Sequence, residues 1–291
     1  MNRTDDEGKQ LLAPGLYLVA TPIGTARDIT LRALDILAAA DVIAAEDTRS
    51  MRRLMEIHGL HLAGRPLIAY HDHSGEGARG RLLAALMEGK SVAYASEAGT
   101  PLVADPGYDL VSAARAAGHD VVSAPGPSAV ITALTLAGLP TDRFLFAGFL
   151  PNASGKRKAV LEELGGVPAT LVFYESPHRI AAALRDAAAV LGGERPAALC
   201  RELTKKFEEV LTGTLAELAQ IAAERPLRGE IVLLVGKGNL PNVGKIDVDS
   251  LLREALKGDS VRDAADRVAA RTGLKRRDVY QRALQMTKDG K

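Results

Sequence analysis

One loop of the chain stands out as a place that could bind a ligand. It comprises Ser96-Glu-Ala-Gly-Thr-Pro101 and, a few residues later, Ala104-Asp-Pro-Gly107. Two prolines and two glycines bend the backbone sharply and leave main-chain N–H and C=O groups free for a ligand. Glu97 and Asp105 make the segment acidic, so it should attract a cationic ligand rather than a phosphate. A purely structural loop is the less favoured interpretation.

Two other loops of the first half carry weaker signals. Thr21-Pro-Ile-Gly24 is neither the G-x-G-x-x-G of a dinucleotide-binding turn nor a phosphate loop, so it allows close approach to a ligand or merely makes a turn. Glu46-Asp-Thr-Arg49 offers two carboxylates, a hydroxyl and a guanidinium. These side chains could serve chemistry, or Asp47 or Thr48 could cap a helix while Arg49 forms a solvated ion pair.

Three further segments gather polar residues. Tyr70-His-Asp-His73 could suggest a metal, but no third ligand is clustered with the two histidines, so a polar substrate-facing loop is favoured and no metal site is predicted. Phe173-Tyr-Glu-Ser-Pro-His-Arg179 ends a predicted strand. The run from Arg201 to Glu209 packs three cations and three acids around Phe207, which indicates either a solvated face or a grip on RNA phosphate.

These loops follow predicted strands of an α/β fold. Short β-branched runs predict strands at residues 16–20, 41–45, 66–70, 91–95 and 120–123, and helical spacing predicts helices at 31–40, 78–87 and 108–117. Strands separated by helices favour βαβ units and a mostly parallel sheet. Ligands of such sheets sit beyond the carboxyl ends of the strands, where the loops above begin.

A second half begins near Pro125-Gly-Pro127. It should contain helices at 129–137, 178–190 and 215–223, strands at 144–149, 170–174, 197–200 and 230–235, and a basic turn at Gly155-Lys-Arg-Lys158. Residues 236–244 have the composition of a linker. From Lys245 onward twelve Lys or Arg face eight Asp or Glu, a net charge of +4, and helices are expected at 261–270 and 277–286, joined at Gly273. The predicted domains are therefore 14–125, 126–240 and a basic helical extension at 245–291.

Composition agrees with a globular protein of about two domains. The chain has 291 residues, is 47% hydrophobic and 25% charged, and carries a net charge of +1, so any nucleic acid must meet a local basic surface. The single cysteine, Cys200, excludes a disulfide framework and a multi-cysteine zinc site. The apolar run at 11–20 is too short to span a bilayer and lacks the pattern of a signal peptide. We therefore expect a cytoplasmic protein.

Several motifs, taken together and in this order, resemble one family. They include Val19-Ala-Thr-Pro-Ile-Gly24, Glu46-Asp-Thr-Arg49, Ala98-Gly-Thr-Pro101, Asp105-Pro-Gly107, Pro125-Gly-Pro-Ser-Ala129, Tyr174-Glu-Ser-Pro-His-Arg179, Arg201-Glu-Leu-Thr-Lys205 and Gly229-Glu230. The chain resembles the bacterial 16S ribosomal RNA (cytidine-2′-O)-methyltransferases, a branch of the tetrapyrrole methylase superfamily, from about residue 14 to 236. The basic tail resembles that family's C-terminal extension. The chain departs from the family at Glu97, at Thr25-Ala26 and at His73-Ser-Gly-Glu76.

The resemblance implies two α/β domains with S-adenosylmethionine in the cleft between them. It implies 2′-O-methylation of a cytidine in the decoding centre of 16S ribosomal RNA, at position 1402 of that RNA. It also implies that the protein is a homodimer and has no membrane partner. The implied cofactor-binding residues are Pro22, Gly24, Glu97, Ala98, Gly99, Thr100, Asp105, Ser128, Ala129, Tyr174, Gly229 and Glu230. Arg49, Arg179, Arg201 and Lys205 are the expected RNA ligands, and Glu46, Asp47 and Glu175 are the candidate catalytic bases.

Two other functions stay open at this point. The first is a methyltransferase of the same fold that acts on a tetrapyrrole or another small molecule. The second is a binding protein of ribosome assembly without catalytic activity. The Arg- and Lys-bearing loops and the basic tail favour RNA over a tetrapyrrole, and the acidic cofactor loop argues against a mere binding protein.

Overall fold

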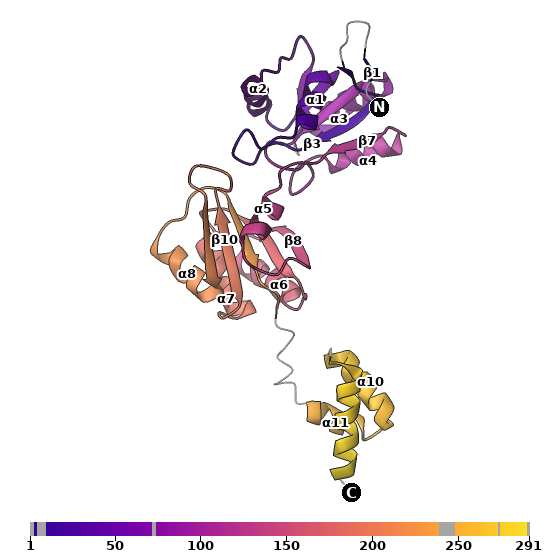
Figure 1. Cartoon of the computed structure of the whole chain (residues 1–291), viewed down its shortest axis with the longest axis vertical. Coiled ribbons are helices and arrows are strands. Elements are labelled where there is room, and N and C mark those ends of the chain that lie inside the picture. Colours follow the sequence, from indigo (N-terminus) through magenta and orange to yellow (C-terminus); the bar gives the residue numbers. More distant parts are fainter. Residues whose placement is uncertain (1–2, 5–9, 72–73, 239–247, 273, 290–291) are drawn as a thin grey trace.

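The computed structural model describes residues 3–4, 10–71, 74–238, 248–272 and 274–289. Within these ranges the chain forms two five-stranded sheets with helices packed on them, followed by a unit of three helices (Figure 1). The α/β fold class expected from the sequence is confirmed. Two two-residue strands, β1 (Arg3–Thr4) and β2 (Gln10–Leu11), pair antiparallel ahead of the first sheet.

The first sheet has the strand order β5-β4-β6-β3-β7, and all its pairs are parallel. Its strands are β3 (Gly15–Val19), β4 (Val42–Ala45), β5 (Leu67–Ala69), β6 (Ser91–Ala95) and β7 (Val121–Ala124). The helices are α1 (Leu31–Ala39), α2 (Thr48–Ile57), α3 (Gly75–Met87) and α4 (Tyr108–Ala116). Every residue of β4 and β6 is buried, as expected of central parallel strands that are covered on both faces.

The second sheet has the order β11-β10-β12-β9-β8 and is mixed, with only the β8–β9 pair parallel. Its strands are β8 (Phe144–Phe149), β9 (Thr170–Glu175), β10 (Pro196–Arg201), β11 (Glu209–Thr214) and β12 (Ile231–Val235). Its helices are α5 (Ala129–Leu136), α6 (Ser154–Gly165), α7 (Ile180–Leu191) and α8 (Leu215–Glu224). One core cluster packs under α6, α7 and α8, and another packs under α5.

The third unit consists of α9 (Val248–Ala255), α10 (Val261–Thr272) and α11 (Arg276–Asp289). It has its own small apolar core, in which Leu252, Val268 and Val279 are buried. Helices α10 and α11 confirm the two helices expected in the tail, while α9 was not expected. Gly273 and most of the predicted linker, residues 239–244, lie outside the described residues.

The structure corrects the sequence prediction at three other elements. The predicted basic turn at 155–158 is wrong, because these residues form the first turns of α6, where Arg157 is buried against Asp186 with its Nη2 2.6 Å from that carboxylate. Strand β11 was not predicted, and helix α2 was expected only through the alternative that Asp47 or Thr48 caps a helix. Asp47 caps α2, since its side chain accepts hydrogen bonds from the Arg49 and Ser50 amides.

The two sheets meet through loops and through an apolar cluster that draws on both. Ile23 and Val103 from the first half pack with Val130, Leu134 and other side chains above the second sheet. Because each half contains one sheet with its own core, we keep 14–125, 126–240 and 245–291 as the proposed domains.

Candidate functional site

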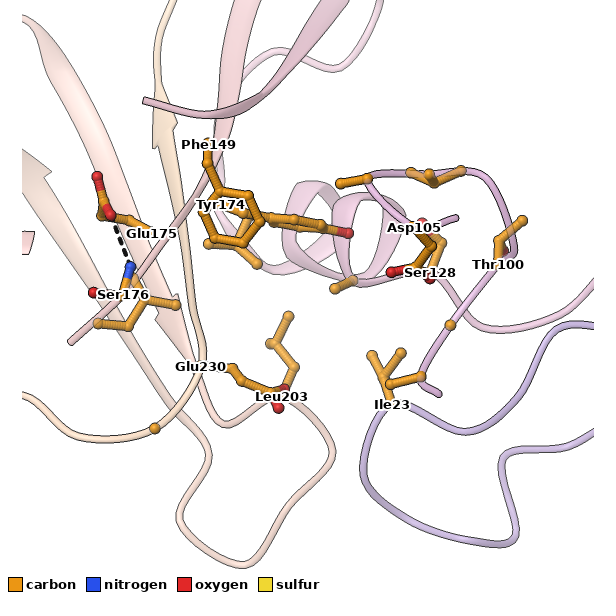
Figure 2. A pocket seen from close by; sticks show the side chains of 18 of the residues that line it. Ile23, Thr100, Asp105, Ser128, Phe149, Tyr174, Glu175, Ser176, Leu203 and Glu230 are labelled. Atoms are coloured by element: carbon orange, nitrogen blue, oxygen red, sulfur yellow. Dashed lines mark hydrogen bonds between the residues drawn. The ribbon is translucent and has the colours of Figure 1, made fainter. Parts of the chain in front are cut away.

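A cavity of about 360 Å³ lies between the two halves, where loops from both sheets meet. The first half contributes the loop that follows β6, together with Ile23 from the loop after β3. The second half contributes the N-terminal end of α5, the end of β9, Leu203 and the start of β12 (Figure 2). Its size is within the range of small-ligand sites.

Hydrogen bonds from the main chain and from two side-chain hydroxyls fix the loop after β6. Gly99 forms an antiparallel bridge with Thr21, with N–O distances of 2.9 and 3.0 Å, and Ser96 Oγ donates to the Gly99 carbonyl at 2.6 Å. Thr100 Oγ1 donates to the Pro127 carbonyl at 2.9 Å. These bonds tie the acidic loop both to the loop after β3 and to the entry of α5, so the cavity wall is preorganised.

Backbone strain is concentrated at the same place. In the described part of the chain five residues other than glycine have a positive φ, and four of them lie in the two loops that border the cavity: Leu102 (71°), Ala104 (60°), Glu202 (51°) and Thr204 (62°). Each such residue costs on the order of 1–3 kcal/mol and is held by its surroundings. Strain of this kind is typical of ligand-binding loops.

Two glycines are required by close packing at the cavity. A Cβ on Gly24 would lie 2.5 Å from Thr204 Oγ1 and 2.9 Å from the Leu203 carbonyl, so a side chain there would push the two halves apart. Gly229 has a φ of +85°, and a Cβ on it would lie 2.2 Å from Glu202 Oε1. The sequence singled out both glycines, but only the tertiary contacts explain them.

Aromatic and acidic side chains line the second wall. The Tyr174 ring extends across the cavity with its hydroxyl toward Asp105 (Figure 2), and its centroid lies 4.8 Å from that of Phe146 and 5.6 Å from that of Phe149. Burial, and then the charge of Asp105, raise the pKa of Tyr174 to about 12. Tyr174 therefore stays a neutral hydrogen-bond donor. Asp105 gives the cavity a negative character suited to a cation, and Glu230 also lines it, with its carboxylate 3.0 Å from Lys205.

Most of the residues expected to bind a cofactor line this cavity. Those that do are residues 98–100, Asp105, Ser128, Ala129, Tyr174, Gly229 and Glu230. Pro22, Gly24 and Glu97 line instead a neighbouring groove of about 200 Å³ between the 21–26 loop and α2. Ile23, Phe149 and Leu203 line the cavity but were not singled out, because an apolar side chain carries no chemical signal in the sequence.

The three candidate bases lie in different surroundings. The Asp47 side chain caps α2 and binds Arg49, which lowers its pKa to about 2. Glu175 lines the cavity but is fully buried, and burial raises its pKa although Ser176 N and Arg179 bind the carboxylate. Glu46 lies beyond β4, and its Oε2 accepts from the Glu97 amide at 3.4 Å.

All four expected RNA ligands form ion pairs. Arg49 binds Asp47 at 2.9 Å, but its side chain remains 90% exposed. Arg179 pairs with buried Glu175, and Arg201 pairs with Glu209 at 2.6 Å. Lys205 lies between two carboxylates, 3.1 Å from Glu202 and 3.0 Å from Glu230. Of the four, Arg49 is thus the one whose charge faces solvent.

Other kinds of site receive no support within the described ranges. No three His, Cys, Asp or Glu side chains of these ranges gather as metal ligands, and Asp72 and His73 lie outside them. None of the helices described is long and apolar enough to cross a membrane.

Comparisons with known proteins agree with this architecture. The family described as Tetrapyrrole (Corrin/Porphyrin) Methylases matches residues 15–219, and the RsmI C-terminal HTH domain matches residues 243–287. A Mesorhizobium japonicum protein named ribosomal RNA small subunit methyltransferase I is 51% identical over 94% of this chain and 93% of its own length. A protein of the same name from Escherichia coli O157:H7 is 44% identical over 93% of this chain and 94% of its own length.

Solved structures share the fold of the two sheets at low sequence identity. Diphthine synthase matches with a TM-score of 0.59 and 19% identity, covering 76% of this chain and 89% of that one. The Thermus thermophilus uroporphyrin-III C-methyl transferase complexed with S-adenyl homocysteine matches with a TM-score of 0.53 and 21% identity, covering 76% and 97%.

Proposed function

The chain belongs to the tetrapyrrole methylases and, among them, to the ribosomal RNA small subunit methyltransferase I family, and we propose that it transfers a methyl group from S-adenosylmethionine to the 2′-hydroxyl of a cytidine in the decoding centre of 16S ribosomal RNA. The observation that carries this proposal is the acidic cavity between the two sheets. The names of the relatives supply the RNA substrate, and the resemblance of the motifs supplies the cytidine and its 2′-hydroxyl.

The residues of the cavity fit S-adenosylmethionine. When bound, this cofactor supplies an activated methyl group on a positively charged sulfur. Asp105 and Glu230 would attract that charge and the amino group, while the glycine-rich backbone at 98–100 and Gly229 leaves room for close approach. Ser128, Ala129 and Tyr174 form the opposite wall. By aligning donor and acceptor, such a cavity can lower the barrier by roughly 7–11 kcal/mol.

Of the three candidate bases, Glu46 is the one that is neither paired with an arginine nor fully buried, and we propose it as the base that removes the ribose proton, although it lines neither the cavity nor the groove. Asp47 is a weak base because its pKa is lowered to about 2, and the Glu175 carboxylate is occupied by Arg179 and the Ser176 amide. A Glu46→Gln variant should lose roughly 10²–10⁴-fold in turnover and keep its affinity for the cofactor. Unchanged turnover would remove Glu46 from the mechanism.

We also propose a homodimer that acts in the cytoplasm. Large apolar side chains are exposed on α5 and on the edge strand β8, among them Ile131, Leu136 and Phe144. Exposed apolar patches of this kind are typical of protein–protein contacts. Sedimentation analysis of the purified protein tests the dimer directly.

Methyl transfer from labelled cofactor decides the function. Small ribosomal subunits from a strain that lacks the modification should accept label, and a ribose-methylation map should place it on the decoding-centre cytidine. Label in a porphyrin precursor instead of RNA would favour a small-molecule methyltransferase. Tight binding of S-adenosylhomocysteine with no turnover on subunits would favour a non-catalytic assembly protein.

A further inference from the structure

Four exposed cations lie on the segments that border the groove beside the cofactor cavity, and none of them forms an ion pair with a described residue; of the four, Arg53 lines the groove itself. They are Arg27, Arg52, Arg53 and Lys206. Lys206 Nζ lies 5.5 Å from the ring centroid of Phe207, which is itself 64% exposed. The lack of an ion pair distinguishes these four cations from Arg179, Arg201 and Lys205, whose charges are matched by nearby carboxylates. We call Arg27, Arg52, Arg53, Lys206 and Phe207 the basic rim.

Contacts between loops join the rim into one surface across the two halves. Arg53 and Ile57 of α2 line the groove opposite Pro22 and Gly24. The His58 ring nitrogen Nε2 lies within hydrogen-bond distance, 2.9 Å, of the Ala26 carbonyl and fastens the 21–26 loop to the end of α2.

The same loop reaches the second half. The Thr25 amide donates to Thr204 Oγ1 at 3.1 Å, and Thr204 precedes Lys206 and Phe207 in the loop between β10 and β11. Figure 1 shows this loop next to the loops of the first half. The rim therefore runs from α2, past Arg27, to the tip that carries Phe207.

The rim also adjoins the cavity. Ile23 lines the cavity, whereas its neighbours Pro22 and Gly24 line the groove. Likewise Ala98 lines the cavity and Glu97 the groove. A polymer whose reacting nucleotide enters the cavity would continue over the groove and the rim.

The combination of unpaired cations and an exposed aromatic ring suits a nucleic-acid strand. Arginines bind phosphates bidentately, and any of the four bases can stack on an aromatic ring. An acidic protein partner would need the cations but not the ring. We propose that the basic rim binds the RNA strand adjacent to the target nucleotide, with Arg27, Arg52 and Arg53 on its phosphates and Phe207 stacked on a base. This inference rests on the proposed function and assigns its substrate a place on the protein.

Binding of the full-length protein to small ribosomal subunits, measured at several salt concentrations, tests the rim. Replacing both Arg52 and Arg53 by Ala should weaken binding and reduce the slope of log affinity against log salt by roughly one for each phosphate that is no longer bound. Phe207→Leu should weaken binding about tenfold at every salt concentration, whereas Phe207→Tyr keeps the ring and should bind like wild type. Arg185→Ala, which removes an exposed cation on α7, is the matched control and should change nothing.

The outcomes separate this inference from the proposed function. If wild type methylates subunits but the rim variants keep its affinity and salt slope, the rim proposal is overturned. If the variants bind a naked decoding-centre RNA like wild type and lose affinity only for the assembled subunit, the rim contacts a ribosomal protein. That result also overturns the rim proposal. If wild type transfers no methyl group to RNA, the proposed function fails whatever the rim does. Affinity for S-adenosylhomocysteine should be unchanged in every variant.

Discussion

Replacing Arg179 by Ala distinguishes a structural ion pair from an RNA ligand. Glu175 ends β9 with its side chain completely buried, and Arg179 precedes the first residue of α7. Arg179 Nε lies 3.1 Å from Glu175 Oε1, and Nη2 donates to Oε2 at 3.3 Å and to the Leu150 carbonyl. The substitution would leave a buried carboxylate without its cation.

The expected cost follows from this burial. Removing one partner of a buried ion pair costs roughly 3–5 kcal/mol. The Arg179 side chain is 27% exposed, so water reaches part of the pair and we take the lower end, about 3 kcal/mol. At about 2–4 °C per kcal/mol for a domain of this size, the midpoint of thermal unfolding should fall by roughly 6–12 °C.

Thermal and urea unfolding of a small set of variants measure this effect. Adding Glu175→Gln to Arg179→Ala should recover part of the loss, because the neutral amide removes the unpaired buried charge. Arg185→Ala, on the exposed face of the same helix, is the control and should unfold like wild type. If Arg179→Ala unfolds like wild type and loses affinity for RNA instead, the assignment of Arg179 as a structural partner is refuted.

Three further predictions concern the cavity and its surroundings. Gly24→Ala should weaken binding of S-adenosylhomocysteine in calorimetry, because the new Cβ would lie 2.5 Å from Thr204 Oγ1 and separate the two halves; unchanged affinity would contradict this packing. Hydrogen bonds from Arg201, and then from Arg225, lower the pKa of Glu209 below its ordinary 4.5, so this carboxylate stabilises the fold above pH 4.5 and the contribution is lost as the pH falls through the lower folded value. The midpoint of thermal unfolding of Glu209→Gln should accordingly fall less at low pH than that of wild type. An equal fall in the two proteins would count against the ion pair between Arg201 and Glu209. Tyr174→Phe keeps the ring but removes a hydroxyl with a pKa of about 12, so affinity for S-adenosylhomocysteine should change by the same factor at every pH well below 12, and a factor that varies with pH would refute the assignment.

The sequence predicted the strands of the first sheet because their signal is local. Runs such as Val42–Ala45 are apolar throughout, which is what a strand covered on both faces requires. Helix α2 was indicated only by its capping residue Asp47, because Thr48–Ile57 is rich in arginine and resembles a polar loop. Helix α6 was mistaken for a turn because Gly155 and three cations stand at its start, although Arg157 is buried there by its bond to Asp186.

The residues of the candidate site were likewise predicted only in part. Glycines, prolines and carboxylates at strand ends pointed to the loops around the cavity, since those residue types are chosen for backbone shape and charge. Apolar lining residues such as Ile23 and Leu203 gave no such signal, because their role depends on which face of a loop they occupy.

The sequence alone therefore determined the α/β class, most of the loops that line the cavity and the motifs that identify the family. Only the tertiary structure decided which charges are paired within the protein and which are available to a ligand. Lys205 reads as a free cation in the sequence, yet it lies within 3.1 Å of Glu202 and 3.0 Å of Glu230, a residue from another loop. Ion pairing falls off with distance and depends on burial, and both are set by contacts between segments far apart in the chain.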